Sequence, residues 1–335
     1  MTWHTLNKTD HFIIERNRAE FEYQKDSPVQ CSFTSLSHDK DPAIYSIVHE
    51  TIYQYLGKVL SSKQLYRLQP VNDLSQAILH YELCSSSDGS FYNFVGAFGN
   101  SATVLEIKNP YKELKIEGRS IVAVSEPVPP CDEVREEKLM IPLIWMPWDR
   151  IMMQAYLMPE ELPESELLDL SEYAMGFVAR NEHKIYAVLL DINNTIYKEY
   201  KYLPKSTTLA TTPYEVFSTR QGVCQDFANL FICLARLLNV PARYRVGYLY
   251  TGGQYEHLGD HDQTHAWVEV FLPNLGWRGF DPTNGCLAGK NHIRVSAGRH
   301  YRDATPTSGV VFAEKFQEKL ISSVRVKRLN YVAST

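Results

Sequence analysis

Three residues in the second half of this 335-residue chain have the types and spacing that a thiol nucleophile requires. Cys224 lies in the segment Gly-Val-Cys-Gln-Asp-Phe, where a run with helical apolar periodicity begins. The first helical turn carries unpaired N–H groups and a partial positive charge. Both stabilise a thiolate, and both stabilise the oxyanion that forms when a thiolate attacks a carbonyl. The competing interpretation is a buried cysteine that fills a gap in the core, as most free cysteines do.

A thiolate nucleophile needs a base, and the base needs a group that orients it. His265 opens a predicted strand, Asp281 ends the next one, and a turn at 273–276 joins the two as a hairpin. Both side chains are therefore predicted at the open end of the hairpin, where they can meet with a small stagger. Taken singly, His265 fits an ordinary hydrogen-bonded residue and Asp281 a turn former before proline. Taken with Cys224, they form a candidate Cys–His–Asp triad.

The elements that must position these residues can be predicted from periodicity. The helix that starts at Cys224 has one apolar stripe and ends before Asn239 and Pro241. Thr212 begins a shorter helix with a capping-box sequence and a proline at its first position. Further helical patterns cover 167–177 and 185–196, and β-runs cover 242–250, 265–272 and 276–281. The second half is therefore predicted to be α+β, with helices first and antiparallel strands after.

The first half has a different texture. Short β-runs separated by turn signals predict a small all-β domain over 44–126. The stretch 127–160 is rich in proline, which disfavours regular helix, and is interpreted as a surface linker. Residues 1–43 are a polar N-terminal extension, 161–290 form the catalytic core, and 291–335 form a C-terminal tail whose last part is one more strand.

Composition narrows the class of protein. Hydrophobic residues make up 44% and charged residues 22% of the chain, as in ordinary globular proteins. A formal net charge of −5 argues against a nucleic-acid-binding surface. No apolar run approaches the roughly 20 residues that span a bilayer, and the first residues contain no signal-peptide core, so we expect no membrane association and a cytoplasmic location. The cysteines show no C-x-x-C pair and are expected to be free thiols (Cys31, Cys84, Cys131, Cys224, Cys233 and Cys286).

Taken together, these segments resemble the transglutaminase-like superfamily, in the bacterial branch described as transglutaminase-like enzymes or cysteine peptidases. Four motifs carry the resemblance in the core, at 222–228, 240–244, 265–270 and 276–285. Segments at 45–55, 65–70 and 98–100 resemble that branch's N-terminal β domain, and 298–309 resembles its tail. The resemblance implies a papain-like core of helices packed on an antiparallel sheet. It also implies roles for the triad, with Cys224 as nucleophile, His265 as general base and acid, and Asp281 as orienter.

The implied activity is thiol-dependent hydrolysis of an amide or peptide bond through a thioester acyl-enzyme, with a peptide or protein as substrate. The alternative is acyl transfer from, or deamidation of, a protein glutamine, because water and an amine can use the same triad. A third interpretation is a non-catalytic binding module, with the β domain docking a partner. No cofactor is expected. The sequence does not predict the oligomeric state or the natural substrate.

Three residues are assigned to the substrate cleft. Gly222 would let a substrate backbone approach closely, Gln225 follows the nucleophile, and Trp267 lies on the same strand face as His265. Core packing is the competing interpretation of the tryptophan.

The loop at 251–264 places two histidines upstream of His265 at a spacing of four residues, which on a helix could hold a metal. Its glycines make a helix unfavourable, so no metal site is expected. The loop is interpreted equally as a cover for the cleft or as a plain solvated loop.

Overall fold

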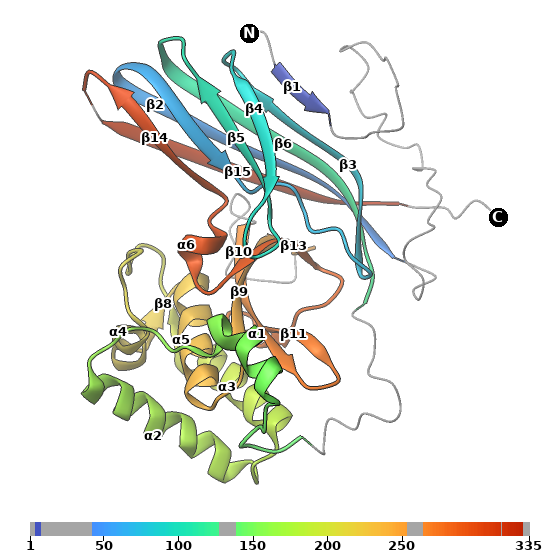
Figure 1. Ribbon diagram of the computed structural model, residues 1–335, viewed down its shortest axis with the longest axis vertical. Helices are drawn as coiled ribbons and strands as arrows, with labels where there is room; N and C mark the ends of the chain where they lie inside the picture. Colours follow the sequence, from blue (N-terminus) through green and yellow to red (C-terminus); the bar gives the residue numbers. More distant parts are fainter. Residues whose placement is uncertain (1–3, 8–41, 127–138, 253–263, 316, 331–335) are drawn as a thin grey trace, which may run out of the picture.

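The computed structural model describes residues 4–7, 42–126, 139–252, 264–315 and 317–330. A β domain and a helix-plus-sheet core lie against each other, with the core sheet between the β domain and the helices (Figure 1). The predicted α+β fold, with an all-β domain ahead of a papain-like core, is confirmed. No helix within these described ranges is long and apolar enough to cross a membrane.

The β domain is organised around one long strand, β2 (Ala43–Tyr66). Alternate residues of β2 are buried over most of its length, because one face of the strand packs inward. The sheet runs in the order β1-β3-β6-β2-β5-β4. The remaining strands of this path are β1 (His4–Asn7), β3 (Gln76–Ser85), β4 (Ser90–Val95), β5 (Ser101–Ile107) and β6 (Tyr111–Val124).

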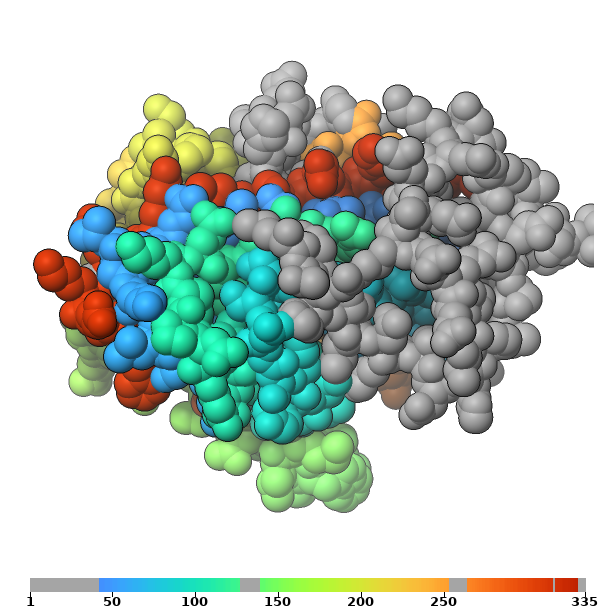
Figure 2. Space-filling model, turned by 90° about the horizontal axis from the view of Figure 1, so that it is seen from above, coloured from blue at the N-terminus to red at the C-terminus, as the bar shows by residue number. Residues whose placement is uncertain are grey.

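The C-terminal part of the chain returns to this sheet. Strands β14 (Thr307–Ala313) and β15 (Glu318–Leu329) both pair antiparallel with β2. In the space-filling view they form one surface with β2, red beside blue (Figure 2). The strand predicted at the end of the tail therefore exists, and it completes the β domain.

In the described ranges the core contributes five helices longer than one turn. The capping box predicted at Thr212 is present, because its hydroxyl accepts from the Glu215 N–H and the Glu215 carboxylate accepts from the Thr212 N–H. One prediction is wrong, since a helix forms inside the proline-rich stretch. Pro147 stands at the first position of this helix, where the backbone N–H that proline lacks would have no partner within the helix. The helices are α1 (Pro147–Leu157), α2 (Glu164–Arg180), α3 (Ile185–Glu199), α4 (Pro213–Thr219) and α5 (Cys224–Leu237).

The core sheet presents the hairpin that the sequence predicted. Its order is β12-β11-β10-β9-β13, and α5 packs on one face, where Phe231 and Leu234 share a cluster with Val268 and Val270. The hairpin closes where Leu272 pairs with Gly276. The strands of this sheet are β9 (Ala242–Leu249), β10 (Thr264–Leu272), β11 (Gly276–Asp281), β12 (Cys286–Leu287) and β13 (His292–Gly298). The core is completed by a short helix, α6 (Tyr301–Ala304), and by a two-stranded ribbon of β7 (Lys201–Tyr202) and β8 (Gln221–Gly222).

An apolar cluster joins the two units. Tyr45 and Ile47 of β2 pack with Val324 of β15 against Tyr248 and Ile293 of the core. All five side chains are at least 98% buried. The β domain is therefore packed directly on the sheet that carries the candidate triad.

Candidate active site

Cys224 is the first residue of α5, so its N–H group belongs to the turn that has no helical acceptors. Asp226 fixes this helix start. Its carboxylate accepts from the Val223 N–H at 2.8 Å and from the Thr207 hydroxyl at 2.6 Å. Burial raises the pKa of Asp226, although both hydrogen bonds oppose that rise. The thiol of Cys224 is half-buried, as a nucleophile that must meet a substrate requires.

Gly222 serves this helix start. It is buried, and a Cβ at this position would lie 2.8 Å from the Cβ of Asp226. Because glycine has no Cβ, the side chain of Asp226 can lie close to residue 222 at the first turn of the helix. The structure thus gives Gly222 a packing role, and the residue does not line the cavity that contains Cys224.

A cavity of about 300 Å³ holds the thiol. Cys224, Gln225 and His265 line one side of it, and His49 and Thr51 of the β domain line the other. Among the described residues that line the cavity, none is an aspartate, glutamate, lysine or arginine. The remaining lining residues are Val223, Tyr244, Val246, Thr264, Ala266, Tyr301, Pro306, Thr307, Leu320 and Ser322.

Trp267 is absent from this lining. Its side chain is fully buried, and its ring packs edge-on against the ring of His292 with centroids 5.2 Å apart. Trp267 therefore takes the packing role that the sequence left as the competing interpretation, whereas Gln225 lies beside the nucleophile.

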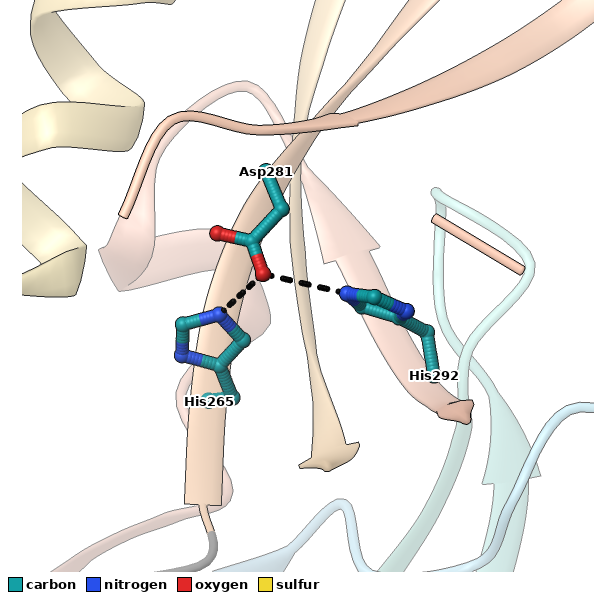
Figure 3. A group of neighbouring side chains, drawn as sticks. All are labelled: His265, Asp281 and His292. Atoms are coloured by element: carbon teal, nitrogen blue, oxygen red, sulfur yellow. Dashed lines mark hydrogen bonds and ion pairs between the residues drawn. The ribbon is translucent and has the colours of Figure 1, made fainter. Parts of the chain in front are cut away.

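His265 and Asp281 meet as the hairpin predicted. The Nε2–H group of His265 donates to Oδ2 of Asp281 at 2.8 Å, and both side chains are buried (Figure 3). Phe280 pairs with Val268, so the hydrogen bond from His265 to Asp281 runs diagonally across the hairpin rather than between directly opposite residues. The other ring nitrogen, Nδ1, is buried, and a side-chain hydrogen bond between His265 and Cys224 contributes to the raised pKa of His265.

The charge of Asp281 sets the protonation of His265. Burial alone lowers the pKa of His265, but the Asp281 carboxylate and then Cys224 outweigh it and raise the pKa to about 10. The contribution of Cys224 shows that the thiol lies within electrostatic range of the imidazole. At neutral pH the imidazole is protonated, which is the state that stabilises a neighbouring thiolate.

Within the part of the chain that the structure describes, five hydrogen bonds hold Asp281. Its Oδ1 accepts from the backbone N–H groups of Thr283 at 3.0 Å and Asn284 at 3.2 Å. Its Oδ2 accepts from His265, from the Asn284 amide at 2.7 Å and from Nε2 of His292 at 3.0 Å. Burial raises the pKa of Asp281, but the two histidines reverse this and hold the pKa far below its ordinary range.

His292 was not singled out from the sequence. It opens β13, inside the region interpreted as a tail, and is 4% exposed. Its only sequence signal is a histidine at the start of an apolar strand, which does not reveal that β13 pairs with β9. Tertiary pairing alone brings it to the carboxylate.

His265, Asp281 and His292 also satisfy the geometry of a metal site. Their ligand atoms lie within 4.8 Å of one another, and all three residues are buried. Both imidazole Nε2 atoms are directed at the same carboxylate oxygen, which is the geometry of two N–H donors. The absence of a metal stays a prediction, and His257 and His261, the other ligands weighed from the sequence, lie outside the described residues together with most of the 251–264 loop.

The other described cysteines are less suited to nucleophilic chemistry. Cys233 is 1% exposed, and burial raises its pKa to about 12. Cys84 is also buried, and Cys286 is half-buried on the short strand β12. Cys31 and Cys131 lie outside the described residues.

Two family profiles match the chain. One is described as the transglutaminase-like superfamily and matches residues 172–282; the other is described as the bacterial transglutaminase-like N-terminal region and matches residues 45–123. An uncharacterized protein of Mycobacterium tuberculosis is 32% identical over 308 residues, which are 84% of this chain and 92% of the relative.

Two further similarities cover the fold and part of the core. A crystal structure from Cytophaga hutchinsonii, described as a "Putative Cysteine Protease", has a TM-score of 0.68 at 21% identity over 88% of this chain and 93% of that one. A protein-glutamine gamma-glutamyltransferase of Pseudomonas aeruginosa is 33% identical over 89 residues, which are 25% of this chain and 13% of the relative.

Proposed function

This chain belongs to the transglutaminase-like superfamily, and we propose that it hydrolyses an amide or peptide bond by means of a Cys224–His265–Asp281 triad. The observation that carries the proposal is the buried hydrogen bond from His265 to Asp281, because it keeps the imidazole protonated and leaves Nδ1 available to Cys224, whose side chain forms a hydrogen bond with His265. A histidine held in this way both stabilises a thiolate and delivers a proton to a leaving group.

In the first half-reaction the Sγ thiolate of Cys224 attacks the carbonyl carbon, and the carbonyl π electrons move onto oxygen. The unpaired N–H groups at the start of α5 donate to this oxyanion. When the oxyanion collapses, the C–N bond breaks and the nitrogen takes the proton of His265. An amine or ammonia leaves, and a thioester remains on Cys224.

In the second half-reaction His265, now neutral, removes a proton from water while the water oxygen attacks the thioester. Collapse of this second intermediate breaks the C–S bond, releases a carboxylic acid and regenerates the thiolate–imidazolium pair. Apart from the catalytic pair, the described residues that line the cavity have uncharged side chains, which suits a neutral acyl group at the scissile bond.

Acyl transfer to an amine is the second candidate. The similarity over 89 residues to a protein-glutamine gamma-glutamyltransferase favours it. In that reaction a primary amine replaces water in the second half-reaction, and the same residues perform every proton transfer.

The test is incubation of the protein with a library of glutamine-containing peptides, with and without a primary amine, followed by mass spectrometry. Chain cleavage indicates peptidase activity, a mass gain of about 1 Da indicates deamidation of glutamine, and incorporation of the amine indicates transfer. Cys224→Ala must abolish every product, and Cys233→Ala, which removes a buried thiol of the same helix, is the matched control. Products that persist in Cys224→Ala would refute the proposal.

A further inference from the structure

His292 has no part in the mechanism above, yet it contacts the triad directly. It lies on the opposite side of the Asp281 carboxylate from His265 (Figure 3). The two rings come from different strands, because β13 and β10 lie on either side of β9 in the sheet. One carboxylate oxygen thus joins a histidine that faces the thiol to a histidine that does not.

The hydrogen bonds of His292 define its tautomer. The backbone N–H of Gly289 donates to Nδ1 at 3.3 Å, so Nδ1 must carry a lone pair. The ring proton is therefore on Nε2, which points at Oδ2 of Asp281 from 3.0 Å. His292 is a fixed donor to the carboxylate, and its ring plane is supported by the edge-on contact with Trp267.

The N–H group of His292 restricts rotation of the Asp281 carboxylate. The backbone N–H groups of Thr283 and Asn284 hold Oδ1, whereas His265 approaches Oδ2 from the hairpin. With His292 on the far side of Oδ2, rotation of the carboxylate away from His265 breaks hydrogen bonds at both oxygens. A carboxylate that cannot rotate keeps the imidazole in the orientation that directs Nδ1 toward the thiol.

We propose that His292 is a positioning residue of the triad, which holds Asp281 so that His265 keeps its orientation toward Cys224. The inference rests on the triad proposed above.

His292 acts through Asp281 because it is absent from the lining of the cavity that contains Cys224. It lines a different cavity, of about 660 Å³, to which the β domain contributes Tyr45 and the core contributes Trp267.

The test measures alkylation of Cys224 by iodoacetamide, because this reaction reports the thiolate and requires no knowledge of the substrate. Trypsin places Cys224 and Cys233 on one peptide, residues 221–236, so fragmentation of this peptide in the mass spectrometer locates the alkylated thiol. His292→Leu removes the donor at similar volume, whereas His292→Gln keeps an N–H group near the position of Nε2. Loss of a hydrogen bond to a charged group should slow alkylation at pH 6 by about 10- to 100-fold in His292→Leu, and by less than about threefold in His292→Gln.

Chemical rescue separates a donor from a space-filling ring. In His292→Ala the large adjacent cavity can admit pyrazole, which supplies an N–H donor, or 1-methylpyrazole, which supplies none, and both compounds are neutral at pH 6. Pyrazole at millimolar concentration should restore the alkylation rate at pH 6, and 1-methylpyrazole should not. Equal rescue by both compounds, or equal rates in His292→Leu and the wild type, would overturn the inference.

Failure of the proposed function has a separate signature. A wild-type Cys224 that reacts at pH 6 no faster than an ordinary free thiol would remove the triad, and the inference with it. A fast wild-type Cys224 that His292→Leu leaves unchanged would overturn the positioning role alone. Thermal unfolding of the three variants shows whether a slow rate comes from loss of the fold, and only a slow variant with a wild-type midpoint supports the positioning role.

Discussion

Replacing Asp281 by asparagine keeps the size of the side chain and removes its negative charge. Asp281 is the group that most raises the pKa of His265, against the opposing effect of burial. Without the charge, burial prevails, and the pKa of His265 should fall from about 10 to below its ordinary value of 6.5. The imidazole would then be neutral at pH 7 and would no longer stabilise a thiolate at Cys224.

The size of the effect follows from the fraction of His265 that is protonated. At pH 7.5 a histidine with a pKa of about 10 is almost fully protonated, whereas one with a pKa of 6.5 or lower is protonated to at most about one part in ten. Because the imidazolium is the form that stabilises the thiolate, alkylation of Cys224 at pH 7.5 should be at least about tenfold slower in Asp281→Asn.

The sign of the pH dependence is equally specific. A raised pKa stabilises the folded imidazolium fully below pH 6.5, and this contribution is lost as the pH rises through about 10. The two alkylation rates should differ most between about pH 6.5 and pH 10, where only the wild-type imidazole is protonated, and converge above about pH 10. Asp73→Asn, which removes a half-exposed carboxylate paired with Arg294, is the matched control and should follow the wild type. Parallel profiles for Asp281→Asn and the wild type would refute the electrostatic argument.

Three further changes test the supporting structure. Glu269→Gln leaves the guanidinium of Arg245, which is 3% exposed, without its anionic partner at 2.6 Å, so the free energy of unfolding in urea should fall by about 3–5 kcal/mol; an unchanged midpoint would contradict this. Burial raises the pKa of Glu269, but three arginines reverse this and hold it well below its ordinary value, so the stabilisation by Glu269 should be complete above about pH 4.3 and decline only below it. Gly222→Ala forces a Cβ against Asp226 and should cost about 1–3 kcal/mol and slow Cys224 alkylation, whereas Gly176→Ala, with nothing within 4 Å of the new Cβ, should do neither. Dialysis against EDTA should leave the alkylation rate unchanged, and a rate that falls and is restored by Zn²⁺ would show that the site uses a metal.

The features that sequence predicted best are local ones. The start of α5 follows from the apolar stripe behind Cys224, and the meeting of His265 with Asp281 follows from a turn that sets the register of one hairpin. The capping box at Thr212 depends on residues three apart. In each case the interacting groups lie within one element or two consecutive ones, so spacing along the chain translates directly into spacing in the fold.

The features that could not be predicted from the sequence depend on pairing between strands far apart in the chain. His292 reaches Asp281 only because β13 joins the sheet beside β9, where His292 pairs with Leu249. A β-pattern predicts that a strand exists, but it does not predict which strand lies next to it. For the same reason the role of Trp267 stayed open, because strand periodicity gives a face without saying whether substrate or protein covers it.

The pairing of β2 with β15 has a consequence for the order of biosynthesis. Ile44 lies opposite Leu329, so a strand that leaves the ribosome before the core finds its neighbour almost 300 residues later. The core strands and helices emerge between the two partners. The β-domain wall of the cavity, which includes His49 and Thr51, therefore acquires its final support only when residues 307–329 have been translated. A nascent chain can complete helix α5, which carries the thiol, well before that point. Pairing of β14 and β15 with β2 then completes the side of the cavity that faces this helix.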